Sequence, residues 1–128
     1  MGIDFYGKTR REMRIPIEAV TTARTLTQND NGKLFTNRGA TGSVTFTLPT
    51  PGASYKGMFF DFFVVADYAL VLSAAEGIVA DDNNTADSVS YATTDEMVGG
   101  SFRAVCDGTS WLVIAAAYDT MTQTIADS

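Results

Sequence analysis

Cys106 is the first residue to test for chemistry, because it is the one cysteine in a chain of 128 residues. A thiolate nucleophile needs a base or a positive charge beside it, and the chain contains no histidine at all. Ser-His and Cys-His catalytic pairs and imidazole metal ligands are therefore excluded. Cys106 follows Val105 in a strand-like run, so we interpret it as a small core residue. A single cysteine also allows no disulfide within the chain.

Oxygen ligands for a cation are concentrated in the segment "DDNNTAD". Calcium prefers carboxylate and amide oxygens, which this segment supplies in its Asp and Asn side chains. Such clusters are more often solvated turns, and that is our interpretation here. We expect no metal and no cofactor, with calcium kept as the alternative. The residues concerned are Asp81, Asp82, Asn83, Asn84 and Asp87.

Hydrolysis of glycans would need a pair of carboxylates. With fifteen acidic residues in the chain, some such pair can always be chosen, so its presence in the sequence does not indicate a glycosidase. Asp95 and Glu96 are interpreted as a solvated loop or a contact between subunits. Trp111 and the aromatic run 59–63 could stack against a sugar ring, but we assign them to the core or to an oligomer interface. The chain is therefore expected not to be an enzyme.

The N-terminal segment 1–20 is the best candidate for binding a partner. Residues 1–14 carry four basic and two acidic side chains, a net charge of +2, whereas the remaining residues carry −8. The overall charge of −6 disfavours a nucleic-acid partner. No run of apolar residues is long enough and free enough of charge to predict a membrane-spanning segment or a signal peptide. The candidate contact residues of this arm are Ile3, Phe5, Tyr6, Lys8, Arg10, Arg11, Arg14, Ile15 and Ile17.

The chain from Val20 onwards is rich in β-branched residues and turn signals, which predicts strands. We therefore expect strands to position the candidate residues beyond Val20. In "SVTFTLP" the apolar residues alternate strictly with hydroxyl residues, and with "KLFTN" before it this segment predicts a hairpin. "SFRAVC" and "SWLVIAA" predict a second hairpin across Asp107-Gly108. About eight short strands indicate a compact, all-β antiparallel β-sandwich or jelly-roll-like domain. We predict an extended arm at 1–20, this domain at 21–117 and a peripheral tail at 118–128.

The strand "MFFDFFVV" is apolar on both of its faces. Phe60 and Phe62 share one face, whereas Phe59 and Phe63 share the other with Asp61. Such a strand is either covered on both sides within its own chain or buried on one side by another subunit. The sequence leaves both readings open. The residues assigned to an oligomer interface are Phe59, Asp61, Phe63 and Val65.

A run of motifs between residues 20 and 116 resembles a module of tailed-bacteriophage virion proteins. The motifs are "LTQNDNGKLFTNRGATGSVTFTLP", "FFDFFVV", "LVLSAAEG" and "GGSFRAVCDGTSWLVIA". They resemble head decoration (cement) proteins, and related modules occur in phage head and tail fibres. These are turn and core motifs rather than catalytic ones.

The resemblance implies a homotrimer that sits on the outer surface of the capsid, after synthesis in the host cytoplasm. Its partners would be the major capsid protein and further copies of itself, and its role would be to stabilise contacts between capsid subunits. Segment 1–20 would then reach the capsid, because a basic arm suits an acidic patch. The alternative is a fibre or receptor-binding module in which exposed loops such as 81–87 contact a host glycan.

Overall fold

The computed structural model describes residues 14–80, 83–91, 97–116 and 123–126. It consists of strands, turns and two single-turn 3-10 helices, η2 (Gln28–Asp30) and η3 (Ala53–Tyr55). The expected compact all-β class is confirmed. The strands are β1 (Ile17–Ala19), β2 (Arg24–Thr25), β3 (Leu34–Thr36), β4 (Val44–Thr47), β5 (Phe59–Phe63), β6 (Leu70–Ala80), β7 (Asn83–Tyr91), β8 (Ser101–Cys106), β9 (Trp111–Ala116) and β10 (Gln123–Ala126).

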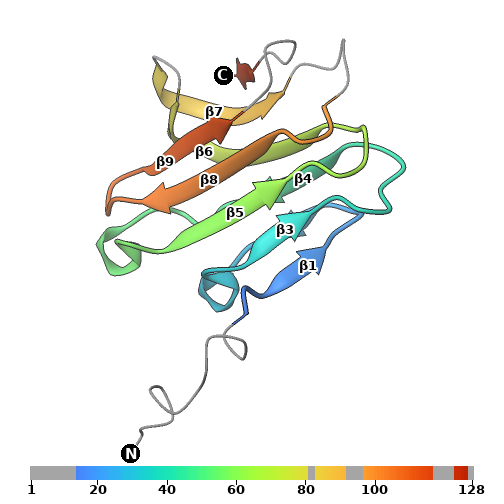
Figure 1. The fold of residues 1–128 in the computed structure, drawn as a ribbon. Helices are drawn as coiled ribbons and strands as arrows, with labels where there is room; N and C mark the ends of the chain where they lie inside the picture. The colour runs from blue at the N-terminus through green and yellow to red at the C-terminus, as the bar shows by residue number, and fades with distance from the viewer. Residues whose placement is uncertain (1–13, 81–82, 92–96, 117–122, 127–128) are drawn as a thin grey trace, which may run out of the picture.

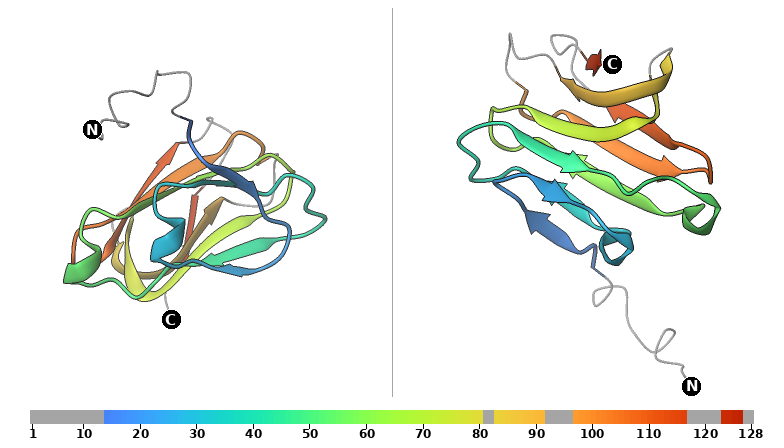
Figure 2. Two further views of the ribbon diagram at one scale, coloured as in Figure 1. Left: turned by 90° about the horizontal axis from the view of Figure 1, so that it is seen from below. Right: turned by 180° about the vertical axis from the view of Figure 1, so that it is seen from behind.

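All ten strands belong to one curled sheet, in the order β1-β3-β5-β8-β9-β6-β4-β2, with β7 paired to β6 and β10 paired to β7. The curl places β1, β3, β5, β8 and β9 in one layer and β2, β4, β6 and β7 in the layer behind it (Figure 1). The second layer is seen from behind in Figure 2. The long strand β6 connects the layers, because its far end pairs with β9.

Strand pairing is mixed, not purely antiparallel as expected. The ladders β1–β3, β3–β5, β2–β4 and β4–β6 are all parallel. They arise because the first six strands alternate between the two layers, so that each strand pairs with the strand two positions later in the chain. Parallel neighbours need a crossover between them, and here the crossover is a strand of the opposite layer.

The predicted hairpin of residues 33–37 and 43–49 is wrong for the same reason, because β3 and β4 lie in different layers and do not pair. An alternating pattern specifies which side chains are buried but not which strand lies alongside. The predicted C-terminal hairpin is confirmed: β8 and β9 pair antiparallel from Ser101–Ala116 to Cys106–Trp111. Gly108 turns the chain between them at a φ of 97°, a conformation that favours glycine.

Aromatic side chains fill the space between the layers. Phe46 lies 5.3 Å from Phe35 and 5.1 Å from Phe62 between ring centroids, so the two layers interdigitate. Trp111 is fully buried beside Phe60 and its indole N–H donates a 2.7 Å hydrogen bond to the carbonyl of Pro49. These contacts confirm Trp111 as a core residue.

Two strands lie where the sequence predicted peripheral segments. β1 falls inside the predicted arm and pairs with β3, whereas β10 falls inside the predicted tail and pairs with β7. Backbone pairing accounts for both, because a short segment can extend a ladder by its backbone hydrogen bonds whatever its side chains are. Within the described residues, no helix is long and apolar enough to span a membrane.

Candidate functional site

Each residue considered above for catalysis or metal binding is buried, belongs to a strand or lies outside the described residues. Cys106 is 1% exposed and its Sγ accepts a hydrogen bond from the Gly108 N–H at 3.4 Å, which confirms it as a core residue. Asn83–Asp87 belongs to β7, not to a loop. Asp81, Asp82, Asp95 and Glu96 lie outside the described residues. Among the residues that the structure describes, no three Asp, Glu or Cys side chains group as metal ligands.

The outer surface of the layer β1-β3-β5-β8-β9 is the most unusual feature of the molecule, and we call it the front face. Strand register places one residue of each strand in a continuous row across it. This central row consists of Ile17, Leu34, Asp61, Arg103 and Ile114.

A second row lies next to the first on the same face. It contains Phe63, which is 40% exposed, between smaller side chains of the neighbouring strands. The row consists of Ala19, Thr36, Phe63, Ser101 and Ala116. On the other side of the central row, Phe59, Val105 and Leu112 are aligned by the same ladders. Most of the side chains in the three rows are therefore apolar.

Asp61 and Arg103 form the only ion pair within these three rows. Both guanidinium nitrogens that face the carboxylate donate to it, Nε to Oδ1 at 2.7 Å and Nη2 to Oδ2 at 3.0 Å. The guanidinium also lies 5.1 Å from the centre of the Phe59 ring, a cation–π distance. The hydrogen bonds that the guanidinium donates to the Asp61 carboxylate raise the pKa of Arg103. Both charges are thus neutralised where they lie, in the middle of an apolar surface.

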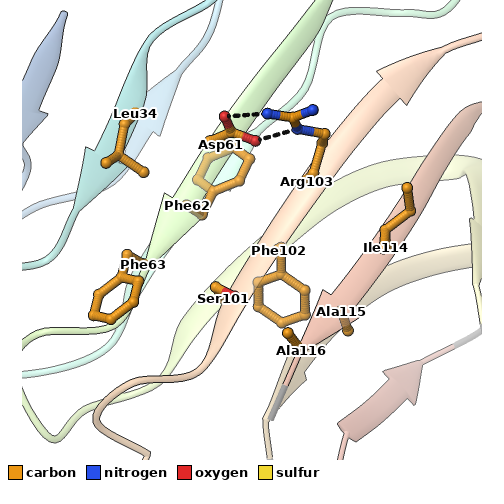
Figure 3. A pocket seen from close by; sticks show the side chains of 10 residues that line it. All are labelled: Leu34, Asp61, Phe62, Phe63, Ser101, Phe102, Arg103, Ile114, Ala115 and Ala116. Carbon is orange, nitrogen blue, oxygen red and sulfur yellow. Dashed lines mark hydrogen bonds and ion pairs between the residues drawn. The ribbon is translucent and has the colours of Figure 1, made fainter. Parts of the chain in front are cut away.

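A shallow groove of about 450 Å³ runs along this surface beside the ion pair (Figure 3). Leu34, Phe63 and Ile114 lie around the groove. The Asp61–Arg103 pair also lines it and is seen at the top of Figure 3. Ile114 is 62% exposed, and Ile17, farther along the central row, is 64% exposed. None of the described segments covers these side chains. Exposed isoleucines at both ends of this row, with Leu34 and Phe63 between them, form an apolar surface of the kind that contacts another protein.

The outer surface of the opposite layer, β2-β4-β6-β7, has a different character, and we call it the back face. Its ladders align Thr25, Thr47, Ser73 and Ser88 in a row across four strands. Hydroxyl side chains on a sheet surface are satisfied by water. This row of the back face is therefore more polar than the rows of the front face.

The structure brings together most of the predicted interface residues. Phe59, Asp61 and Phe63 lie together on the front face, whereas Val65 follows the end of β5, and its N–H donates to the side chain of Asn37. Among the described residues, β5 is covered on its inner side only, and burial of its outer side by another subunit stays a prediction. Of the predicted arm residues, Arg14, Ile15 and Ile17 are exposed. The others, Ile3, Phe5, Tyr6, Lys8, Arg10 and Arg11, lie outside the described residues.

Sequence reasoning missed Leu34, Arg103 and Ile114, although the alternation within their strands was visible. Pattern alone does not show that β3, β8 and β9 flank β5, which is what aligns these residues with Asp61.

The fold and this surface define an all-β protein with an apolar sheet face that the described residues leave uncovered. The chain matches no known protein-family model, and comparison with curated proteins finds no match.

Proposed function

We propose that this protein is a structural component of a bacteriophage virion that binds the outer surface of the capsid as a homotrimer and stabilises contacts between major capsid subunits. The observation that carries the proposal is the front face. An apolar surface across five strands fits a protein whose task is to contact other proteins. The motif resemblance between residues 20 and 116 supplies the class of assembly.

The hydrogen bonding and aromatic packing inside the body support a cementing role. Every buried side-chain nitrogen or oxygen in the described residues has a hydrogen-bond partner, and the aromatic core connects both layers. A rigid body loses little conformational freedom on binding, so more of the contact energy is available to hold capsid subunits together.

The charge distribution supports a separate role for the N-terminal arm. Residues 1–14 have a net charge of +2 in a chain of net charge −6, and they include Phe5 and Tyr6. A basic segment with aromatic residues suits an acidic patch on the capsid. Three arms on one trimer would multiply weak single contacts, because each later contact becomes intramolecular.

Capsid binding tests this proposal directly. Capsids of the phage that encodes the chain, prepared without it, are mixed with the purified protein and sedimented. We expect the protein to sediment with the capsids, and we expect the capsids to withstand a higher temperature before they release DNA. The double variant Phe5→Ala/Arg10→Ala should bind more weakly, whereas Arg38→Ala, an exposed arginine in the β3–β4 connection, serves as the control. An intact chain that does not sediment with capsids at any concentration would refute the proposal.

A further inference from the structure

We propose that residues 2–6 of this chain bind the open edge of β1 as a further strand, and that this strand widens the front face with Ile3 and Phe5. Three observations carry this inference, and none of them depends on the proposed function. They are the unpaired backbone of β1, the alternation of side chains within residues 2–6 and the short distance in sequence between the two segments.

The outer edge of β1 is open to a further strand. β1 is the outermost strand of the front layer and pairs with β3 on one side only (Figure 1). The Pro16 carbonyl accepts from β3 and the Val20 N–H donates to β3, so residues 16, 18 and 20 face β3. The N–H and C=O groups of Ile17 and Ala19 therefore point away from the sheet. Among the described residues, these groups have no hydrogen-bond partner.

Two features that often protect an edge strand do not block this site. A proline interrupts an edge when its missing N–H lies on the open side, but Pro16 faces β3. A charged side chain protects an edge when it projects into solvent there, whereas Glu18 is held by Arg24 and Lys33. The unpaired groups of β1 are therefore a template on which another strand can pair.

The chain's own N-terminal segment is the occupant best placed for this edge. Residues 1–13, which lie outside the described residues, end shortly before β1 begins. β3 takes the inner edge of β1, so a chain that reverses before β1 can pair only with its outer edge. Residues 7–13 would form the connection, and closing so short a loop costs less than recruiting a strand from another molecule. Residues 2–6 contain no proline, so each can donate to a ladder.

Alternation of the side chains indicates how the two strands pair. Ile17 belongs to the central row of the front face, and Ile15, two residues earlier, is 65% exposed. The proline between them favours an extended backbone at Ile15, which puts both side chains on the same side. An antiparallel strand that pairs Ile3 with Ile17 and Phe5 with Ile15 would place all four apolar side chains together on the front face.

The same register avoids a conflict between charges. It puts Gly2 opposite Glu18 and Asp4 opposite Pro16, so the Glu18 carboxylate keeps its two cations. A shift of two residues would instead place Asp4 opposite Glu18, and like charges in that position destabilise a ladder. The basic side chains of residues 7–13 would lie in the connection, beside the widened front face.

Disulfide trapping in the full chain tests this register with a matched pair of variants. Facing residues of an antiparallel pair have Cβ atoms about 5 Å apart, close to the distance in a disulfide. Ile3→Cys/Ile17→Cys should therefore form a disulfide within one chain. It should do so about tenfold faster than Asp4→Cys/Ile17→Cys, because residue 4 points to the other side of the strand. Ile17 is 64% exposed and Cys106 is 1% exposed, so folding should not change and the native thiol should not compete.

Amide hydrogen exchange tests the pairing without a substitution in β1. The N–H groups of Ile15 and Ile17 would bond to the added strand, so deletion of residues 2–6 should speed their exchange by about tenfold or more. The Val20 N–H bonds to the Thr36 carbonyl in either case, and its exchange should stay the same. Unchanged exchange at both Ile15 and Ile17 would overturn the inference.

Two results of the trapping experiment would also overturn it. Equal rates in the two cysteine pairs would mean that residues 2–6 take no fixed register, and a disulfide that joins two chains would assign the edge of β1 to another copy. The proposed function is tested separately. A chain trapped by Ile3→Cys/Ile17→Cys whose unsubstituted form ignores capsids refutes only that function, whereas equal trapping rates in a chain that sediments with capsids refute only this inference.

Discussion

Arg24 on β2 and Glu18 on β1 form an ion pair that joins the strands at the two ends of the main strand order. Both guanidinium Nη nitrogens donate to the Glu18 carboxylate. β1 and β2 are the two ends of the strand order, so the sheet does not close between them by backbone hydrogen bonds. A side-chain contact therefore holds together the side of the molecule where the ladder is interrupted.

Asp30 and Lys33 complete this contact. Asp30 is 5% exposed and accepts hydrogen bonds from Arg24 at 3.0 Å, from Lys33 at 2.9 Å and from the Thr27 N–H at 3.0 Å. Lys33 also donates to Glu18 at 3.2 Å. Two carboxylates and two cations thus alternate across the open side. Networks of this kind stabilise more than isolated surface pairs do.

We predict that acid weakens the protein through this network. The hydrogen bond from Arg24 lowers the pKa of Glu18. Burial opposes ionisation of Asp30, but hydrogen bonds from Lys33 and the Thr27 N–H outweigh it, and the pKa is lowered. Groups with a lowered folded pKa stabilise the protein above their unfolded values, about 3.9 for Asp and 4.3 for Glu. The melting temperature should therefore stay constant near neutral pH and decrease as the pH falls through about 5 and below.

Asp30→Asn is the variant that checks this pH dependence. It should lower the melting temperature at pH 7, because the amide replaces a carboxylate that holds two cations. It should also reduce the slope of melting temperature against pH between about 3 and 5. A variant with the same slope as the parent protein would assign the acid sensitivity to other carboxylates.

A second prediction concerns Asn37, which is fully buried. Its Oδ1 accepts from the N–H groups of Val65 and Ala66 at 2.7 and 2.9 Å, and its Nδ2 donates to the carbonyls of Ala66 and Tyr68 at 3.0 and 3.3 Å. Asn37→Ala should lower the free energy of unfolding by about 2 to 4 kcal/mol, since it leaves buried backbone groups unpaired. Urea denaturation measures this change.

Arg38→Ala is the matched control for Asn37→Ala, because Arg38 is the next residue along the chain and is exposed. Its effect on the free energy of unfolding should stay within about 0.5 kcal/mol. If the two substitutions proved equally mild, water would have replaced the Asn37 amide, and the side chain would not determine the β5–β6 connection.

A third prediction compares two glycines. A Cβ at position 100 would lie 2.6 and 2.7 Å from ring carbons of Tyr91, whose hydroxyl donates to the carbonyls of Ser101 and Ala116. Gly100→Ala should therefore destabilise the protein by about 1 to 3 kcal/mol. At Gly42 a Cβ would meet nothing within 4 Å, so Gly42→Ala should be neutral or stabilise by less than about 1 kcal/mol. Thermal unfolding of both variants provides the comparison.

The single tryptophan supplies a fourth prediction. Trp111 is fully buried and bonded to the Pro49 carbonyl. Its fluorescence in the folded protein should lie at short wavelength and resist quenching by iodide, and both properties should be lost together in urea. Efficient quenching of the folded protein would mean that the β9 end of the core opens to solvent.

The sequence alone determined the strand content and much of the core. Strict alternation in residues 43–49 indicated that Val44, Phe46 and Leu48 share one face, and all three are buried. Gly108 marked the β8–β9 turn, and the absence of histidine by itself excluded imidazole chemistry. The strands and the turn could be predicted because they depend on local backbone preferences and on a period of two.

Only the tertiary structure decided which strands are neighbours. β3 pairs with β1 and β5 instead of β4, because the chain crosses between layers after each of the first five strands. That crossing aligns Leu34 and Arg103 with Asp61 and brings Ile114 into the same row. The front face brings residues up to 97 positions apart, Ile17 and Ile114, into one row through the strands that lie between them. Local sequence patterns do not contain that information, because a strand's alternation is the same whichever neighbour it has.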